Sequence, residues 1–172
     1  LIFLFFKKYY NTKEISSAVT KEVIFVSSYH DNQSWTVDVR NSMLNEFSNG
    51  PFQINMHNIY LHSKSITSFA ERKKILKANI EPIRDKVDII VASDLEATEQ
   101  MMDYITSDSI KSPVVMLSEH SYNEKNENNN IYSIVTETGI RSTFEFALKT
   151  FPHAKKVYVW SDKTITGNYY MD

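Results

Sequence analysis

The chain has 172 residues, a net charge of −2, no basic block and no cysteine. Its length fits one domain, or one domain and part of a second, and allows a core large enough to fold without staples. The charge argues against nucleic-acid binding, and the lack of cysteine excludes disulfides, thiolate chemistry and cysteine-bound zinc or iron–sulfur sites.

The first twenty residues are expected to be a membrane or signal remnant and its tether. Residues 1–6 are all apolar, and Lys7 and Lys8 follow them. A bilayer span needs about 20 apolar residues, so this run is too short to cross a membrane. It is either the tail of a cut signal peptide or membrane helix, or a buried first strand. We favour the remnant, because residues 7–21 then form a polar tether that holds the domain near the outer face of a membrane.

Short apolar runs alternate with helical patterns along the rest of the chain. Strands are predicted where apolar residues are continuous or alternate with polar ones, at residues 23–26, 52–57, 87–92, 113–117, 131–135 and 156–160. Helices are predicted where apolar side chains recur at helical spacing, in the stretches that begin near residues 34, 69, 95 and 140. An alternation of roughly 30 residues is typical of right-handed βαβ units. The predicted fold class is therefore α/β, with a doubly wound, mostly parallel sheet.

Polar residues mark the expected ends of these helices. Ser34, a serine within residues 65–68 and Asp94 are predicted to be N-caps, because short polar side chains accept hydrogen bonds from the free amides of a first turn. Asn49-Gly50-Pro51 is predicted to stop the first helix, and Pro82 to end or kink the second.

The residues that follow each strand are the candidate binding residues. In an open α/β sheet, ligands bind beyond the carboxyl ends of the strands. The candidates are Ser28, Tyr29, His30, Trp35, Ser93, Asp94, Ser118, Glu119, His120, Thr136, Glu137, Thr138, Ser161, Asp162 and Thr164. Tyr29 lies at a strand exit and belongs to no apolar stripe. Trp35 could stack on a ligand or belong to the core, since it heads the apolar stripe of its helix.

The positions of the glycines and histidines argue against a nucleotide site, a serine hydrolase site and a metal site. A dinucleotide site or a P-loop needs glycines after a strand, and the three glycines of this chain are at positions 50, 139 and 167. A serine hydrolase of this fold class needs a Gly-x-Ser-x-Gly elbow, which is missing. His57 and His62 are spaced poorly for metal ligands. No metal site and no cofactor are therefore predicted.

A phosphoacceptor receiver domain shares this rhythm of strands and helices and is the main rival. Asp94 follows the third strand, where a phosphoacceptor aspartate would lie. A receiver also needs an acidic pair after the first strand and a lysine after the fifth. In place of the acidic pair the chain has only Asp31, which lies well past the first strand. In place of the lysine after the fifth strand it has Glu137. Asp94 is therefore interpreted as a helix N-cap.

Several strand-end segments together resemble a known family. They are Val26-Ser27-Ser28-Tyr29-His30 with Ser34-Trp35-Thr36, Asp88-Ile89-Ile90-Val91-Ala92-Ser93-Asp94, Pro113-Val114-Val115-Met116-Leu117, Phe151-Pro152-His153-Ala154-Lys155-Lys156-Val157-Tyr158-Val159 and Asp162-x-Thr164-x-Thr166-Gly167. In this order they resemble the periplasmic-binding-protein-like sensor domains of bacterial histidine kinases, which are relatives of ABC transporter substrate-binding proteins. The loops Asp31-Asn32-Gln33 and Ser118-Glu119-His120 depart from the family pattern.

The resemblance implies two α/β lobes with a ligand bound between them. Residues 1–20 would be the membrane remnant, residues 21–137 lobe one, and residues 138–172 the incomplete start of lobe two. The implied function is a bacterial extracytoplasmic sensor, anchored in the membrane and exposed to the periplasm. It would bind a small molecule and act on a membrane-coupled signalling module of a two-component system, with a homodimer as an option. The domain itself would not be an enzyme, although a histidine kinase could follow it.

Two other functions stay open at this point. The first is a substrate-binding component of an ABC-type transporter, and the second is a cryptic hydrolase on the same scaffold that uses His30 and the loop serines. In the sensor interpretation, the expected polar contacts to the ligand are Tyr29, His30, Asp94, Glu119 and Asp162.

Overall fold

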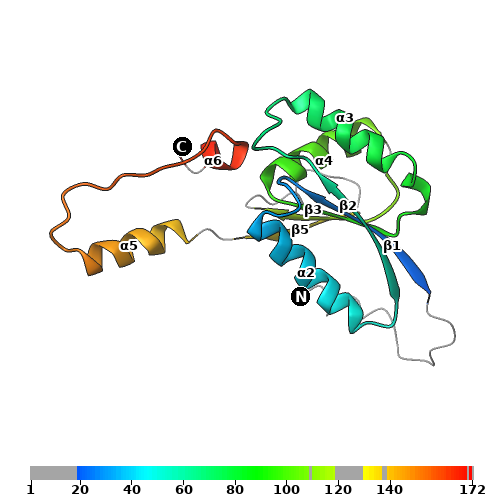
Figure 1. Ribbon diagram of the computed structural model, residues 1–172, viewed down its shortest axis with the longest axis horizontal. Coiled ribbons are helices and arrows are strands. Elements are labelled where there is room, and N and C mark those ends of the chain that lie inside the picture. The colour runs from blue at the N-terminus through cyan, green and yellow to red at the C-terminus, as the bar shows by residue number, and fades with distance from the viewer. Residues whose placement is uncertain (1–18, 109, 119–129, 137–138, 170, 172) are drawn as a thin grey trace.

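Five short, mainly apolar runs pair side by side in one parallel sheet. The computed structural model describes residues 19–108, 110–118, 130–136, 139–169 and 171. The strands are β1 (Thr20–Ser27), β2 (Gln53–Tyr60), β3 (Ile89–Ser93), β4 (Val114–Ser118) and β5 (Ile131–Val135). Their order is β2-β1-β3-β4-β5, and every pairing is parallel (Figure 1). The predicted α/β class with a parallel sheet is confirmed, whereas the two lobes of a periplasmic binding protein are not.

The helices begin and end close to the predicted positions. They are α2 (Ser34–Ser48), α3 (Phe69–Ile80), α4 (Leu95–Ser107), α5 (Ile140–Thr150) and α6 (Ile165–Tyr169), with a short 3-10 turn η1 (Arg84–Lys86). Ser68 caps α3, because its side chain accepts a 3.3 Å hydrogen bond from the amide of Glu71. α3 ends just before Pro82, as predicted. The N-cap of α2 is Gln33 and not Ser34, which already lies in the first turn. No helix formed by the described residues is both long enough and apolar enough to cross a bilayer.

Different helices cover the two faces of the sheet. α3 and α4 pack on one face, and their apolar side chains enclose the larger core, which includes Ile24, Leu76, Ile90, Met101, Tyr104 and Met116. On the other face, α2 packs through Met43 on Phe25 and Val91. Figure 1 shows α2 on one side of the sheet and α3 with α4 on the other. This layering is that of a doubly wound fold.

An ion pair at the amino ends of β1 and β3 fixes their register. Lys21 Nζ lies 2.6 Å from Asp88 Oδ1, and the amide of Glu22 donates a 2.9 Å hydrogen bond to Asp88 Oδ2. Burial favours the neutral form of Asp88, but these hydrogen bonds outweigh it and lower the pKa of Asp88. The resulting register places Ser27 beside Ser93 at the carboxyl ends of the two strands.

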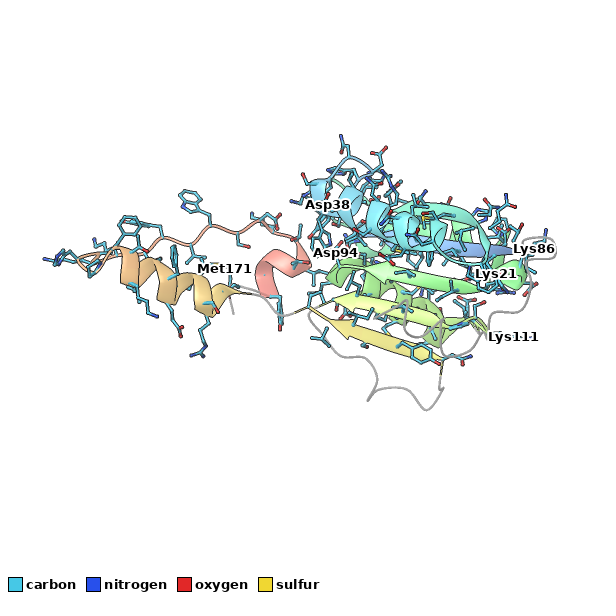
Figure 2. The ribbon with its side chains drawn as sticks, turned by 90° about the horizontal axis from the view of Figure 1, so that it is seen from below. Lys21, Asp38, Lys86, Asp94, Lys111 and Met171 are labelled. Carbon is cyan, nitrogen blue, oxygen red and sulfur yellow. The ribbon has the colours of Figure 1, made fainter. Side chains whose placement is uncertain are left out.

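Residues 139–160 leave the sheet and form an arm. α5 has no buried residue, and residues 151–160 are all exposed. Figures 1 and 2 both show the arm projecting beyond the carboxyl ends of the strands before the chain returns to α6. The predicted strand at 156–160 is wrong, because within the described part of the chain no strand lies beside it to share backbone hydrogen bonds. The predicted lobe boundary at 137–138 lies outside the described residues and stays a prediction.

Candidate functional site

Ser28 joins β1, β3 and the first turn of α4 at the carboxyl ends of the strands. Its amide and its hydroxyl both donate to the carbonyl oxygen of Ser93, at 3.3 Å and 3.2 Å. The same hydroxyl accepts a 2.8 Å hydrogen bond from the amide of Ala97. Ser28 and Ser93 are fully buried. Both residues therefore hold the fold together and have no surface to offer to a ligand.

Glu96 is the central polar group of this edge. It lies in the first turn of α4, and only 1% of its surface is exposed. Its Oε1 accepts a 2.8 Å hydrogen bond from the amide of Ile165, and its Oε2 accepts a 3.0 Å bond from the hydroxyl of Thr166. A residue of α4 thus binds the first turn of α6, which is 69 to 70 residues away in the sequence. A carboxylate in this place satisfies amides that a helix start leaves free.

Residues 161–169, the docking segment, are folded so that they can meet Glu96. Thr164 caps α6, because its hydroxyl accepts a 3.0 Å hydrogen bond from the amide of Gly167 and donates to Asp162 Oδ1. The hydroxyl of Ser161 donates to the carbonyl of Gly167 at 2.7 Å. A methyl group on Gly167 would lie 2.7 Å from Ser161 Oγ and nearer still to Asp162. Only glycine fits at this position.

Tyr29 and Lys64 flank the docking segment. Only 9% of Tyr29 is exposed, and burial raises the pKa of its hydroxyl, which a hydrogen bond with Thr166 partly offsets. Lys64 Nζ lies 5.1 Å from the centre of the Tyr29 ring and 3.5 Å from Asp162 Oδ2. The pKa of Asp162 is lowered, first by the hydrogen bond from Thr164 and further by the charge of Lys64. The segment is therefore held by an aromatic ring and by charge as well as by Glu96.

Buried polar side chains of α3 and α4 stand behind Glu96. Arg72 is buried and donates a 2.7 Å hydrogen bond to the carbonyl of Ile66. Burial lowers the pKa of Arg72, and the negative charge of Glu96 opposes this change. Gln100, one turn after Glu96, donates to the carbonyl of Phe69 at 3.0 Å. The positive charge of Arg72 thus compensates a carboxylate that would otherwise be costly to bury.

A cluster of rings lies at the ends of β1 and β2. The imidazoles of His30 and His62 stack with their centres 5.7 Å apart, and Tyr60 meets His62 edge-on. Arg40 of α2 donates a 2.8 Å hydrogen bond to the hydroxyl of Tyr60. His62 has a φ of 51°, in the left-handed region. His30 is therefore part of a contact between two loops, which its position at a strand end did not reveal.

Asp94 lies at the carboxyl end of the central strand β3. It occupies the N-cap position of α4, but its φ of 74° is left-handed and its side chain makes no cap hydrogen bond. The prediction that its side chain caps the helix is therefore wrong. The residues that follow β1 are Ser28 and Tyr29, and Thr136 follows β5. The carboxylate pair and the lysine of a phosphoacceptor site are missing from these positions.

The structure brings together some of the predicted site residues and leaves others apart. Tyr29, Asp162 and Thr164 meet at the docking segment. Trp35 lies in the first turn of α2 with 44% of its surface exposed, so it is not a core residue, and its stacking on a ligand stays a prediction. The predicted residues Glu119, His120, Glu137 and Thr138 lie outside the described residues.

Sequence reasoning missed three charged residues that help to build this edge, namely Glu96, Lys64 and Arg72. An acidic residue in a first helical turn usually serves only the helix dipole, so Glu96 carried no signal of its contact with α6. The pair Asp162-x-Thr164 preceding a glycine was visible, but its partner was not.

Comparisons with known proteins give a structural likeness and no family. No family model matches the chain, and no curated protein matches it. A search of solved structures returned the crystal structure of a response regulator receiver protein from Sinorhizobium medicae WSM419, with 16% sequence identity and a TM-score of 0.37. The match covers 81% of this chain and 98% of that chain.

The predicted membership of the periplasmic-binding-protein-like sensor family is wrong, since the structure that matches is a receiver protein. Three of the segments that suggested the family contain apolar runs that end at polar residues, and they lie at β1, β3 and β4. This pattern is common to strands buried in a parallel sheet. These three segments therefore indicated the sheet and not the family, and the other two lie outside the strands.

The functional expectations that depended on this family are wrong with it. They are the extracytoplasmic sensor, the ABC-type transport component and the anchored, periplasmic location. Whether the chain has an enzymatic activity, such as that of the cryptic hydrolase, is not tested by this likeness and stays a prediction. The expected partners, a small-molecule ligand and a membrane-coupled signalling module, are corrected as well, whereas the homodimer stays a prediction. The physical reason is that Ser28 and Ser93 are buried against each other, and the docking segment occupies the edge where a ligand was expected. The absence of a nucleic-acid partner stays a prediction.

Proposed function

We propose that this chain is a non-enzymatic interaction module whose carboxyl edge binds a polypeptide segment. The observation that carries the proposal is the buried carboxylate of Glu96, which accepts hydrogen bonds from the backbone of Ile165 and the side chain of Thr166. In the structure, the bound segment is residues 161–169 of the same chain. Main-chain hydrogen bonds supply affinity in such contacts, and side-chain contacts supply selectivity.

The contacts around Glu96 favour a defined segment over an arbitrary one. Lys64 selects an acidic residue at the position of Asp162, and the tight turn requires the glycine at 167. Tyr29 adds an apolar surface with a hydroxyl that meets Thr166. A segment of the type Asp-x-Thr-x-Thr-Gly therefore fits this edge.

The same geometry argues against catalysis. The hydroxyls of Ser27 and Thr36 are hydrogen-bonded to each other at 2.9 Å, and both residues are buried. The hydroxyl of Ser28 is likewise engaged with the backbone of Ser93 and Ala97. A nucleophile needs a nearby base and an open approach for its substrate. These serines have neither, because they serve to close the edge of the sheet.

The docking segment is suited to exchange with a partner segment. Its own helix α6 is only five residues long, and the exposed arm joins it to the sheet. A segment from another protein with the same features would compete with it at Glu96. Binding would therefore be controlled by whether residues 161–169 are docked or released.

Release of the docking segment by mutation tests the proposal. Gly167→Ala should detach α6, because the added methyl group collides with Ser161 and Asp162. A synthetic peptide of residues 160–171 should then bind the Gly167→Ala chain in calorimetry and bind the wild-type chain far less. Amide exchange at Ile165 and Thr166 verifies the release.

The double variant Gly167→Ala/Glu96→Ala is the decisive comparison. It should lose peptide binding, whereas Gly167→Ala/Glu46→Ala should keep it, since Glu46 is an exposed carboxylate on α2. Equal binding by both double variants would show that Glu96 does not hold the segment and would overturn the proposal.

A further inference from the structure

The docking segment is joined to the sheet by an arm that the sheet does not hold in place. Among the described residues, no hydrogen bond and no ion pair connects residues 139–160 to the sheet body, by which we mean the five strands with α2, α3 and α4. Both figures show the arm well away from the sheet body. The choice of docking segment therefore depends on the contacts at Glu96, Lys64 and Tyr29, which the same segment of a second copy could make equally well.

The arm bends back on itself at residues 151–154. α5 ends at Thr150, and Pro152 disfavours a helical conformation at Phe151. The amide of Ala154 donates a 3.0 Å hydrogen bond to the carbonyl of Phe151 and closes the turn, and all of residues 151–160 are exposed. If the turn opens, residues 151–160 can extend up to about 33 Å beyond α5. The docking segment can then reach a second copy, and water replaces the hydrogen bond of the turn.

α5 carries an apolar stripe that a second copy can cover. Ile140, Phe144, Ala147, Leu148 and Phe151 recur at helical spacing along one side of the helix. Ile140, Leu148 and Phe151 are 40%, 53% and 64% exposed, and no residue of α5 is buried. A helix of 11 residues is only marginally stable in water unless such a stripe is packed. Two copies of α5 can pack stripe against stripe about a two-fold axis, which gives both stripes the same cover.

The arm and the rest of the chain carry charges of opposite sign. Residues 139–160 contain four basic side chains and one acidic side chain, whereas the remaining residues contain 15 basic and 20 acidic ones. In an exchanged pair, residues 151–160 of each copy lead toward the sheet body of the other. The net charges therefore attract each arm to the second copy.

We propose that two copies of this chain exchange their docking segments, so that the segment of each copy lies on Glu96 of the other and the two α5 helices pack through their stripes. The inference rests on the proposed function and names a second copy as the partner. The contacts at Glu96, Lys64 and Tyr29 are all kept, because the same residues supply them from the other copy. The apolar surface that the two helices withdraw from water is what the pair gains over the single chain.

Isotope mixing with cross-linking tests the exchange. Equal amounts of isotope-labelled and unlabelled wild-type chain are refolded together from urea at the highest soluble concentration and treated with a carbodiimide, which joins a lysine to a carboxylate in contact with it. Lys64 Nζ lies 3.5 Å from Asp162 Oδ2, so this pair reports the docking segment. Lys21 and Asp88, 2.6 Å apart within the sheet body, are the internal control. Mass spectrometry of the linked peptides should find mixed-isotope Lys64–Asp162 links as often as same-isotope ones, and only same-isotope Lys21–Asp88 links.

The outcomes separate this inference from the proposed function. Only same-isotope Lys64–Asp162 links would overturn the exchange and leave the docking of the segment in its own chain intact. Loss of every Lys64–Asp162 link, with Lys21–Asp88 links present, would overturn both. The proposed function fails by itself if Glu96→Ala leaves the yield of Lys64–Asp162 links unchanged, whatever their isotope pattern.

Charges placed on the two sides of α5 test the packing of the helices. Leu148→Glu puts a charge into the stripe and should lower the share of mixed-isotope links, and Phe151→Glu should act in the same way. Ser142→Glu is the matched control, because Ser142 lies on the side of α5 away from the stripe, and the share should not change. Equal shares in all three variants would overturn the packing of the two α5 helices. The Lys21–Asp88 links show in each variant that the sheet body is folded.

Discussion

Two short segments of nearly the same chemistry have opposite fates in this molecule. Residues 23–26 of β1, Val-Ile-Phe-Val, are at most 1% exposed, whereas residues 157–160, Val-Tyr-Val-Trp, are between 53% and 91% exposed. A charged residue precedes each run, Glu22 the first and Lys156 the second. β1 has β2 on one side and β3 on the other, but the second segment has no neighbour among the described strands. Strand propensity alone therefore does not place a strand, because the backbone groups also need a neighbouring strand with which to form hydrogen bonds.

The largest expected difference between the two segments is in core packing. Phe25→Ala should lower the free energy of unfolding by about 3–5 kcal/mol, since it leaves a cavity between the sheet and α2. Trp160→Ala should change it by less than about 0.5 kcal/mol, because Trp160 is 91% exposed. Urea unfolding followed by circular dichroism measures both values. A large loss of stability from Trp160→Ala would show that the arm is packed in solution.

A smaller difference in stability is expected between the loss of a buried serine hydroxyl and the loss of an exposed one. Ser28→Ala leaves the buried amide of Ala97 without its acceptor and should cost about 1–3 kcal/mol. Ser161→Ala removes the bond to the carbonyl of Gly167 in an exposed turn, where water can replace it. Its effect on global unfolding should be within about 0.5 kcal/mol. Equal losses of unfolding free energy in the two variants would contradict the conclusion that Ser28 joins β1, β3 and the first turn of α4.

Gly167→Ala should separate the docking segment from the sheet without loosening the sheet. The collision with Ser161 and Asp162 is local, and none of the three residues belongs to the core of the sheet. Hydrogen exchange should become fast at Ile165 and Thr166 and remain slow in β1 and β3. Faster exchange in β3 as well would mean that α6 contributes to the stability of the sheet.

The smallest expected effect is a pH response of the docking segment. The pKa of Asp162 is lowered in the folded state, chiefly by the hydrogen bond from Thr164. Its stabilising effect is therefore present above the ordinary aspartate pKa of about 3.9 and is lost as the pH falls through the lowered value. The amide signal of Thr164, followed by NMR from about pH 5 downward, should shift with a midpoint below the ordinary aspartate value of about 3.9. Asp162→Asn should abolish this titration.

Much of the sheet was predictable, and the reasons are local. The apolar runs at 23–26, 87–92, 113–117 and 131–135 each became part of a parallel strand, because an unbroken apolar run suits a strand that is covered on both faces. Ser68 and Pro82 bounded α3 through cap and ring geometry that acts within a few residues. The predictions failed at positions where the local sequence pattern does not decide whether a side chain reaches the core. Trp35 fits the stripe of α2 but lies in its first turn, beyond the edge of the core.

The candidate site was predictable only in its location. The rule that functional residues gather at the carboxyl ends of parallel strands pointed to Tyr29 after β1. It pointed to Asp162 and Thr164 through a predicted strand at 156–160 that does not form, although these residues do meet Tyr29 at the docking segment. Their common partner, Glu96, was not foreseen, because its local setting in a first helical turn already explains an acidic residue. The family resemblance failed for a related reason, since apolar runs are common to strands buried in parallel sheets and do not identify one family.

The sequence by itself determined the α/β class, the five strands of the parallel sheet and the bounds of α3, because each depends on periodicity or capping within about one or two turns of chain. Only the tertiary structure decided that residues 161–169 dock on Glu96 and that α5 and residues 157–160 project from the sheet. The contact between Glu96 and Thr166 joins residues 70 positions apart. Neither residue carries a local mark of the other, because such a contact exists only after the strands have brought both to the same edge.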